Sequence, residues 1–138
     1  MFAILPISTG YEVLGLLHIL SAIAAFGPLF VYPSMIRAGA GAEVAKWHLR
    51  LSLPALVLAW VFGMGMIGAS DEIIEMADGW IVASLIIWVA LVLVGRLLIR
   101  PSLADPTERA RSMLGAGIGI THLGLVVMLW LMVFKPGR

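Results

Sequence analysis

The chain has 138 residues, of which 62% are hydrophobic and only 12% are charged. Soluble domains carry about 25% charged residues, so nine basic and eight acidic side chains are too few for a water-exposed globule. A net charge of +1 excludes a nucleic-acid partner held by bulk charge, and the lack of cysteine excludes disulfides, thiolate catalysis and zinc–thiolate sites. The composition therefore indicates a membrane protein whose main partner is the lipid bilayer.

Four apolar stretches predict four membrane-spanning helices, because crossing a bilayer takes about 20 mostly apolar residues. In chain order the predicted spans cover about 13–35, 51–69, 80–99 and 113–134. The short connections make consecutive helices antiparallel neighbours. We therefore predict one all-α domain over residues 1–138, an up-and-down bundle of four transmembrane helices.

Local signals refine the helix ends. Thr9–Glu12 and Asp105–Glu108 have the pattern of capping boxes that begin the first and last helices. Pro28, Pro33 and Pro54 are expected to bend or shorten the first two helices.

Basic residues are concentrated in two of the three connections. The connections before the second and the fourth span, with the helix ends beside them, carry seven: Arg37, Lys46, Arg50, Arg96, Arg100, Arg109 and Arg111. The C-terminal end carries only Lys135 and Arg138, and the middle connection carries none. Cytoplasmic loops are enriched in Lys and Arg, which predicts a multi-pass protein with both termini outside.

Two histidines lie within the predicted spans, where an ionisable side chain is costly and usually functional. His18 shares its helical face in the first span with Ser21, Ala22 and Ala25, and His122 lies in the last span. Small neighbours either let helices touch or leave space for a flat cofactor. Each histidine is therefore a candidate haem or metal ligand, or a donor to another helix. The helix rise places His18 roughly 10 Å and His122 roughly 18 Å from the outer surface. This difference in depth argues against one haem bound by both histidines, because its two ligands should lie at about the same depth.

Two further features favour structural roles. His48 lies beside Trp47 and Arg50 at the cytoplasmic edge of the second span, where such residues commonly anchor helices. The acidic connection Asp71–Asp78 places carboxylates on one face of a predicted short helix, a pattern that could hold a hard cation. We favour a solvated amphipathic turn on the membrane surface.

The last span carries Gly115 and Gly119, whose spacing is typical of helices in close contact. These glycines predict a contact within the bundle, with a second copy, or with another membrane partner. Gly124 lies off that face.

Short apolar motifs occur along most of the chain. They are Leu17–Leu20 followed by Pro33 in the first span, Pro54-Ala55 with Phe62-Gly63 in the second, and Phe134-Lys135-Pro136 at the end. Together they resemble the bacterial HemJ-type membrane proteins, which are protoporphyrinogen oxidases. The chain is similar also to small four-helix proteins of unknown function in the same CopD-like superfamily. This resemblance implies a protein of the bacterial cytoplasmic (inner) membrane with His18 as a ligand of haem b.

The chain departs from the HemJ-type pattern at two positions. Ser84 stands where those proteins carry a Lys after a Trp, and Ser34 stands where they carry an Arg after a Pro. The resemblance therefore does not imply that this chain oxidises porphyrinogens, and no catalytic residue is predicted. We expect a protein that binds haem b through His18, with His122 as a further candidate ligand, for a redox or porphyrin-related role. A non-enzymatic assembly protein and a small-solute or metal-ion transporter are the alternatives.

Overall fold

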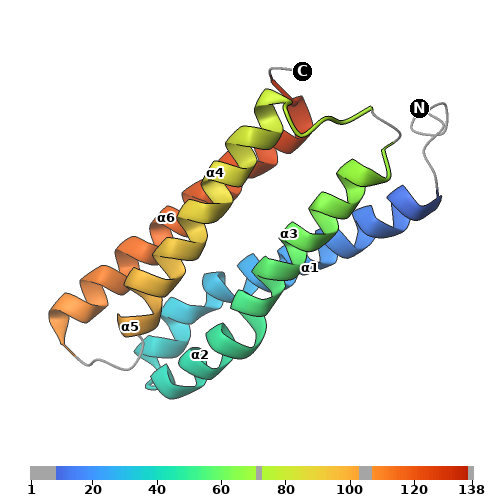
Figure 1. Ribbon diagram of the computed structural model, residues 1–138. Helices are drawn as coiled ribbons and strands as arrows, with labels where there is room; N and C mark the ends of the chain where they lie inside the picture. Colours follow the sequence, from blue (N-terminus) through green and yellow to red (C-terminus); the bar gives the residue numbers. More distant parts are fainter. Residues whose placement is uncertain (1–8, 71–72, 103–106, 137–138) are drawn as a thin grey trace.

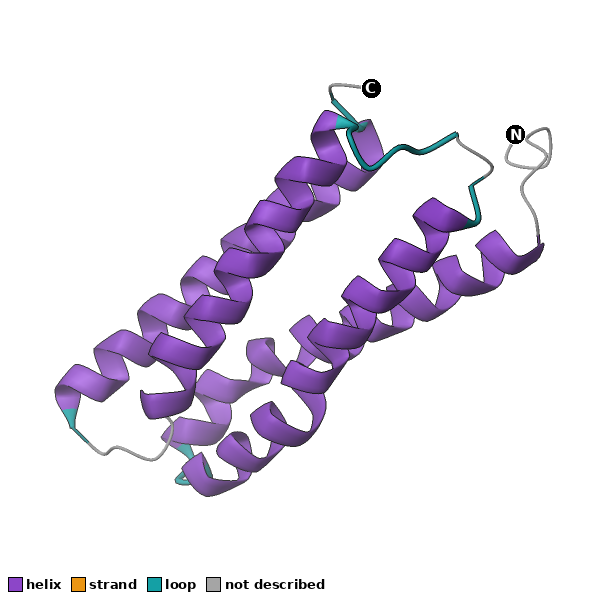
Figure 2. Ribbon diagram, viewed as in Figure 1, coloured by secondary structure: helices purple, strands orange, loops and turns teal. Residues whose placement is uncertain are grey.

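The computed structural model describes residues 9–70, 73–102 and 107–136. Nearly all of these residues are helical, and no strand occurs among them (Figure 2). The helices in chain order are α1 (Thr9–Arg37), α2 (Gly41–Trp47), α3 (Leu53–Gly68), α4 (Gly79–Val94), α5 (Arg100–Ser102) and α6 (Glu108–Phe134). Two π-helical turns, η2 (His48–Ser52) and η3 (Gly95–Ile99), join α2 to α3 and α4 to α5 without a break.

These elements form four continuous helical rods, each long and apolar enough to cross a membrane. The rods run over Thr9–Arg37, Gly41–Gly68, Gly79–Ser102 and Glu108–Phe134. The predicted all-α bundle of four membrane-spanning helices is confirmed. Each rod is longer than the stretch that predicted it, because helical structure continues into the polar flanks of the apolar segments.

The rods pack as two hairpins. α1 packs along α3, and α4 packs along α6 (Figure 1). α3 and α4 follow one another in the sequence but touch at only a few points. The hairpins meet at the end that carries α2 and α5, and they part toward the end where the chain termini lie (Figure 1).

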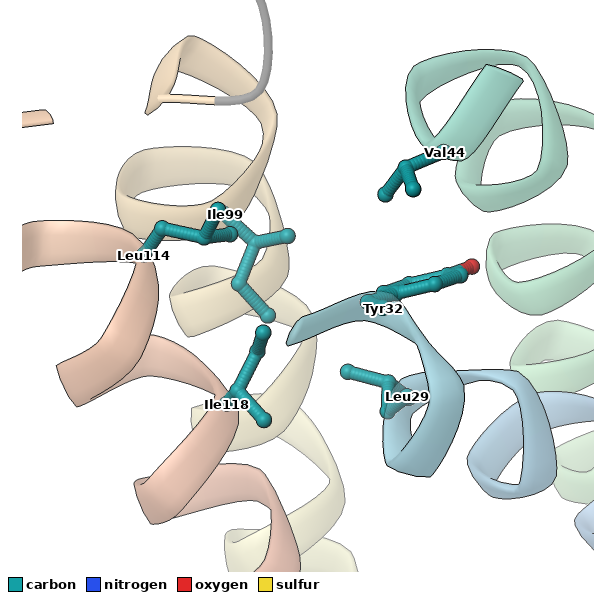
Figure 3. Packing of buried hydrophobic residues seen from close by; sticks show 6 residues of the cluster. All are labelled: Leu29, Tyr32, Val44, Ile99, Leu114 and Ile118. Carbon is teal, nitrogen blue, oxygen red and sulfur yellow. The ribbon is translucent and has the colours of Figure 1, made fainter. Parts of the chain in front are cut away.

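A buried apolar cluster, here called the junction, lies where the hairpins meet. It consists of Leu29 and Tyr32 of α1, Val44 of α2, Ile99 of η3, and Leu114 and Ile118 of α6 (Figure 3). Tyr32, Val44 and Ile99 are almost completely buried. Because lipid chains are as apolar as these side chains, close packing rather than exclusion of water holds the junction together.

Both π-helical turns end two residues before a proline. Pro54 and Pro101 lack a backbone N–H, so the carbonyl four residues earlier loses its usual donor. The helix widens there. In η2 the N–H of Leu53 donates to His48 O, and in η3 the matching bond is accepted by Gly95 O.

The prolines do not end the first two helices early, and the other expected outcome, a bend, stays a prediction. α1 continues through Pro28 and Pro33 to Arg37. Pro54 lies inside the continuous helix Gly41–Gly68, and the wider turn η2 carries the helix into it without a break.

The glycines of α6 that contact another helix are not the predicted pair. A Cβ built on Gly124 would lie 2.7 Å from Leu91 Cδ2, and one built on Gly117 would lie 2.8 Å from a side-chain carbon of η3. A Cβ on Gly115 or Gly119 would meet no described atom within 4 Å. The prediction that Gly115 and Gly119 pack within the bundle is therefore wrong, because the face of α6 toward α4 is the one that carries Gly117 and Gly124.

The last long helix begins later than its capping pattern predicts. Thr107 is the N-cap of α6, and its Oγ1 accepts a hydrogen bond from Ala110 N at 3.2 Å. Asp105, the predicted N-cap, lies outside the described residues.

The acidic connection is also different from its prediction. Residues 73–78 form turns instead of a short helix, and Asp78 Oδ2 accepts a hydrogen bond from Glu75 N at 3.1 Å. Ile74 is buried against the ends of α4 and α6. Asp71 lies outside the described residues, and the rest of the chain that the structure describes holds no group of three His, Asp or Glu side chains suited to a metal ion.

Candidate functional site

A cavity of about 290 Å³ lies between the two hairpins. Residues of α1, α3, α4 and α6 line it, and its aromatic and thioether side chains include Phe26, Trp60, Trp80, Trp88, Met64 and Met128. Ligand pockets are typically mostly apolar, with a small number of polar groups that orient the ligand. The polar groups on this cavity include His18, Ser84 and Lys135.

The imidazole of His18 is held against α3. Its Nδ1 lies 2.6 Å from the carbonyl oxygen of Ala59, and since a carbonyl only accepts, Nδ1 carries the proton. Nε2 is therefore the nitrogen of the ring that is not used in this bond. Metal-ligating histidines commonly donate one ring N–H to a backbone carbonyl and bind the metal through the other nitrogen. His18 thus has the arrangement of a ligand.

Two tryptophans form a flat aromatic wall of the cavity. Trp60 of α3 and Trp88 of α4 stack with ring centroids 5.6 Å apart and planes inclined by 26°. Trp88 Nε1 also donates to Leu56 O of α3 at 3.0 Å. These contacts connect α3 and α4, which otherwise pack little against each other.

The end of α6 brings a cation to the same cavity. Lys135 has a left-handed backbone conformation (φ 48°), and its N–H donates to Leu131 O at 2.8 Å. Its Nζ lies 5.5 Å from the centroid of the Trp80 ring, a cation–π contact with the start of α4. The cavity therefore combines an imidazole with an ammonium group.

Only one of the small residues predicted to leave space beside His18 lines the cavity, namely Ala22. Ser21 and Ala25 are buried, Ala25 in an apolar cluster with Phe26. The space beside His18 therefore comes more from the parting of the hairpins than from small side chains.

His122 lies elsewhere. Its ring stacks on Phe30 of α1, with centroids 4.1 Å apart and planes inclined by 12°, and its Nε2 is buried without a partner among the described residues. His122 is not among the residues that line the large cavity. Phe30 follows His18 by twelve residues, roughly 18 Å along α1. The structure thus brings His18 to the cavity and not His122, whose role as a cofactor ligand stays a prediction.

His48 lies beside the junction, next to Tyr32. It is only 2% exposed, and neither ring nitrogen has a hydrogen-bond partner among the described residues. The Tyr32 ring packs edge-on against it at a centroid distance of 5.9 Å. Successive helical residues point in different directions, so Trp47 faces outward while His48 faces the other hairpin. The depth expected for His48, at the cytoplasmic edge of the second span, stays a prediction.

No protein-family model matches the chain, and no curated protein or solved structure matches it. The resemblance to HemJ-type and CopD-like proteins therefore stays a hypothesis. Ser84 lines the same cavity as His18 and donates to Trp80 O at 2.7 Å.

Proposed function

We propose that this polytopic membrane protein binds haem b in the cavity between its hairpins, with His18 Nε2 as a ligand of the iron. The observation that carries the proposal is the hydrogen bond from His18 Nδ1 to Ala59 O at 2.6 Å. That bond orients the ring and leaves Nε2 beside a largely apolar cavity.

The other side chains on the cavity suit the same guest. Haem b is a flat, mostly apolar ring with two carboxylates on one edge. The Trp60–Trp88 stack offers it a flat apolar surface, and Lys135 offers a cation for a carboxylate. A bound haem supplies a one-electron couple whose potential depends on the axial ligand and on the dryness of the pocket. The chain itself binds the ring, orients it and excludes water.

The visible absorption spectrum of protein purified from haem-supplied cells tests the proposal. We expect a Soret band in the wild type that disappears in His18→Ala. Free imidazole should restore the band, because the truncated side chain leaves room for it. Leu16→Ala, at an exposed position on the same helix, is the matched control and should retain the band. Folded, colourless wild-type protein would refute haem binding.

His122→Ala decides in the same experiment whether the second histidine takes part. Because His122 stacks on Phe30 and does not line the cavity, we expect an undiminished band. A weakened band would identify His122 as a further contributor.

Assembly with another membrane helix is the second candidate function. It is favoured by the outward face of α6, where a Cβ on Gly115 or Gly119 would meet no described atom within 4 Å. Two glycines four residues apart let a partner helix approach closely. Crosslinking in native membranes should give a product that Gly119→Leu abolishes and Gly27→Leu, at an equally open position on α1, preserves.

A further inference from the structure

We propose that one water molecule is bound between His48 and Gly95 and bridges the two hairpins beside the junction. A second cavity of about 20 Å³ lies there, and its lining includes His48, Ser52, Gly95 and Thr121. A cavity of roughly 10–15 Å³ is enough for one water molecule, so this one accommodates a water and excludes larger ligands. The proposal is independent of haem binding.

The imidazole of His48 creates the need for a polar partner. His48 is only 2% exposed, and both ring nitrogens lack a partner among the described residues. Gly95 lies next to the ring, since both residues line this small cavity. Buried polar groups are nearly always paired with protein atoms or with ordered water. A water molecule in this cavity would supply the partner that the His48 ring lacks.

The two π-helical turns provide the space for this water. His48 is the first residue of η2, and Gly95 is the first residue of η3. A Cβ on Gly95 would lie 3.8 Å from His48 Nε2 and 3.4 Å from Leu53 Cδ2. The missing side chain of Gly95 therefore leaves open volume beside Nε2.

The chemistry of the lining favours water over a metal ion. A neutral imidazole presents one donor and one acceptor, and a water molecule serves either. Two nearby hydroxyls already have partners, since Ser52 Oγ lies 2.7 Å from Tyr32 Oη and Thr121 Oγ1 donates to Gly117 O at 2.8 Å. None of the described residues that line this cavity is a carboxylate or a second imidazole. A cation would therefore lack a ligand set.

Solid-state NMR of protein with ¹⁵N-labelled histidine, in lipid bilayers, tests the proposal directly. We expect magnetisation transfer from water to the His48 ring in the wild type. In Gly95→Ala the methyl group fits without a clash but occupies the volume beside Nε2. The transfer should be lost and the melting temperature should fall, because the ring loses its partner.

Gly115→Ala is the matched control, since its Cβ meets no described atom within 4 Å. It should keep the water signal and should not lower the melting temperature. The proposal is overturned if wild-type His48 shows no transfer from water. It is also overturned if Gly95→Ala melts as high as the control, because the methyl group would then have filled a dry space. The wild-type spectrum decides the question even if Gly95→Ala does not fold.

Discussion

A Cβ on Gly63 would lie 3.1 Å from Cε1 of the His18 ring, closer than most side chains approach one another. The Ala59 carbonyl that accepts the His18 proton lies one helical turn before Gly63. The histidine thus reaches its partner because Gly63 has no side chain in the way. The tautomer that frees Nε2 depends on a glycine in another helix.

We therefore predict that Gly63→Leu removes the Soret band as completely as His18→Ala does. The leucine side chain would displace the imidazole from Ala59 O and close the space beside it. Gly68→Leu, on the same helix with no described atom within 4 Å of its Cβ, should keep the band. A full band in folded Gly63→Leu protein would show that the iron is not held by His18 in this position.

The packing of α6 against η3 gives a second prediction. Gly117→Leu should lower the free energy of unfolding by roughly 1–3 kcal/mol or more, because its Cβ would lie 2.8 Å from Ile99 Cγ1 and Ile99 is locked in the junction. Gly119→Leu should leave the free energy of unfolding nearly unchanged, since its Cβ points into open space. Thermal unfolding in detergent compares the two variants. Equal losses would mean that the assigned face of α6 is wrong.

The buried hydrogen bond between Tyr32 and Ser52 gives a third prediction. Their hydroxyl oxygens lie 2.7 Å apart and join α1 to η2. Tyr32→Phe and Ser52→Ala should each lower the free energy of unfolding by about 0.5–1.5 kcal/mol. The double variant should lose less than the sum, because both changes remove the same bond. Strictly additive losses would show that the bond contributes nothing.

Membrane orientation is the fourth prediction. Reporter fusions after Gly39, in the turn between α1 and α2, should be cytoplasmic because that end of the protein carries most of the basic residues. Fusions at Arg138, which lies outside the described residues, should report the opposite compartment. A cytoplasmic C-terminal fusion would contradict the orientation.

The sequence predicted the four rods because long apolar stretches have few other solutions in a membrane. It did not predict which helix faces pack against each other, because the lipid-facing side and the inward side of a membrane helix are equally apolar. The difference between Gly115 and Gly117 is a rotation of about 200° around α6, which spacing alone does not reveal. The inward turn of His48 was missed for the same reason. His18 was found because an imidazole within a span is unusual whichever way it faces.

Three residues that line the large cavity, Ile19, Trp60 and Leu129, are also more than one-third exposed on the outer surface of the helices. In a bilayer those outer surfaces contact hydrocarbon chains, so we expect access to the cavity from the lipid side. If the cavity binds a guest, as proposed, we expect a guest dissolved in the membrane to reach His18 by lateral diffusion without crossing water. Occupancy then follows the guest's concentration in the lipid, and detergent tails compete for the same volume. Protein kept in vesicles should therefore retain its guest more fully than the same protein in micelles.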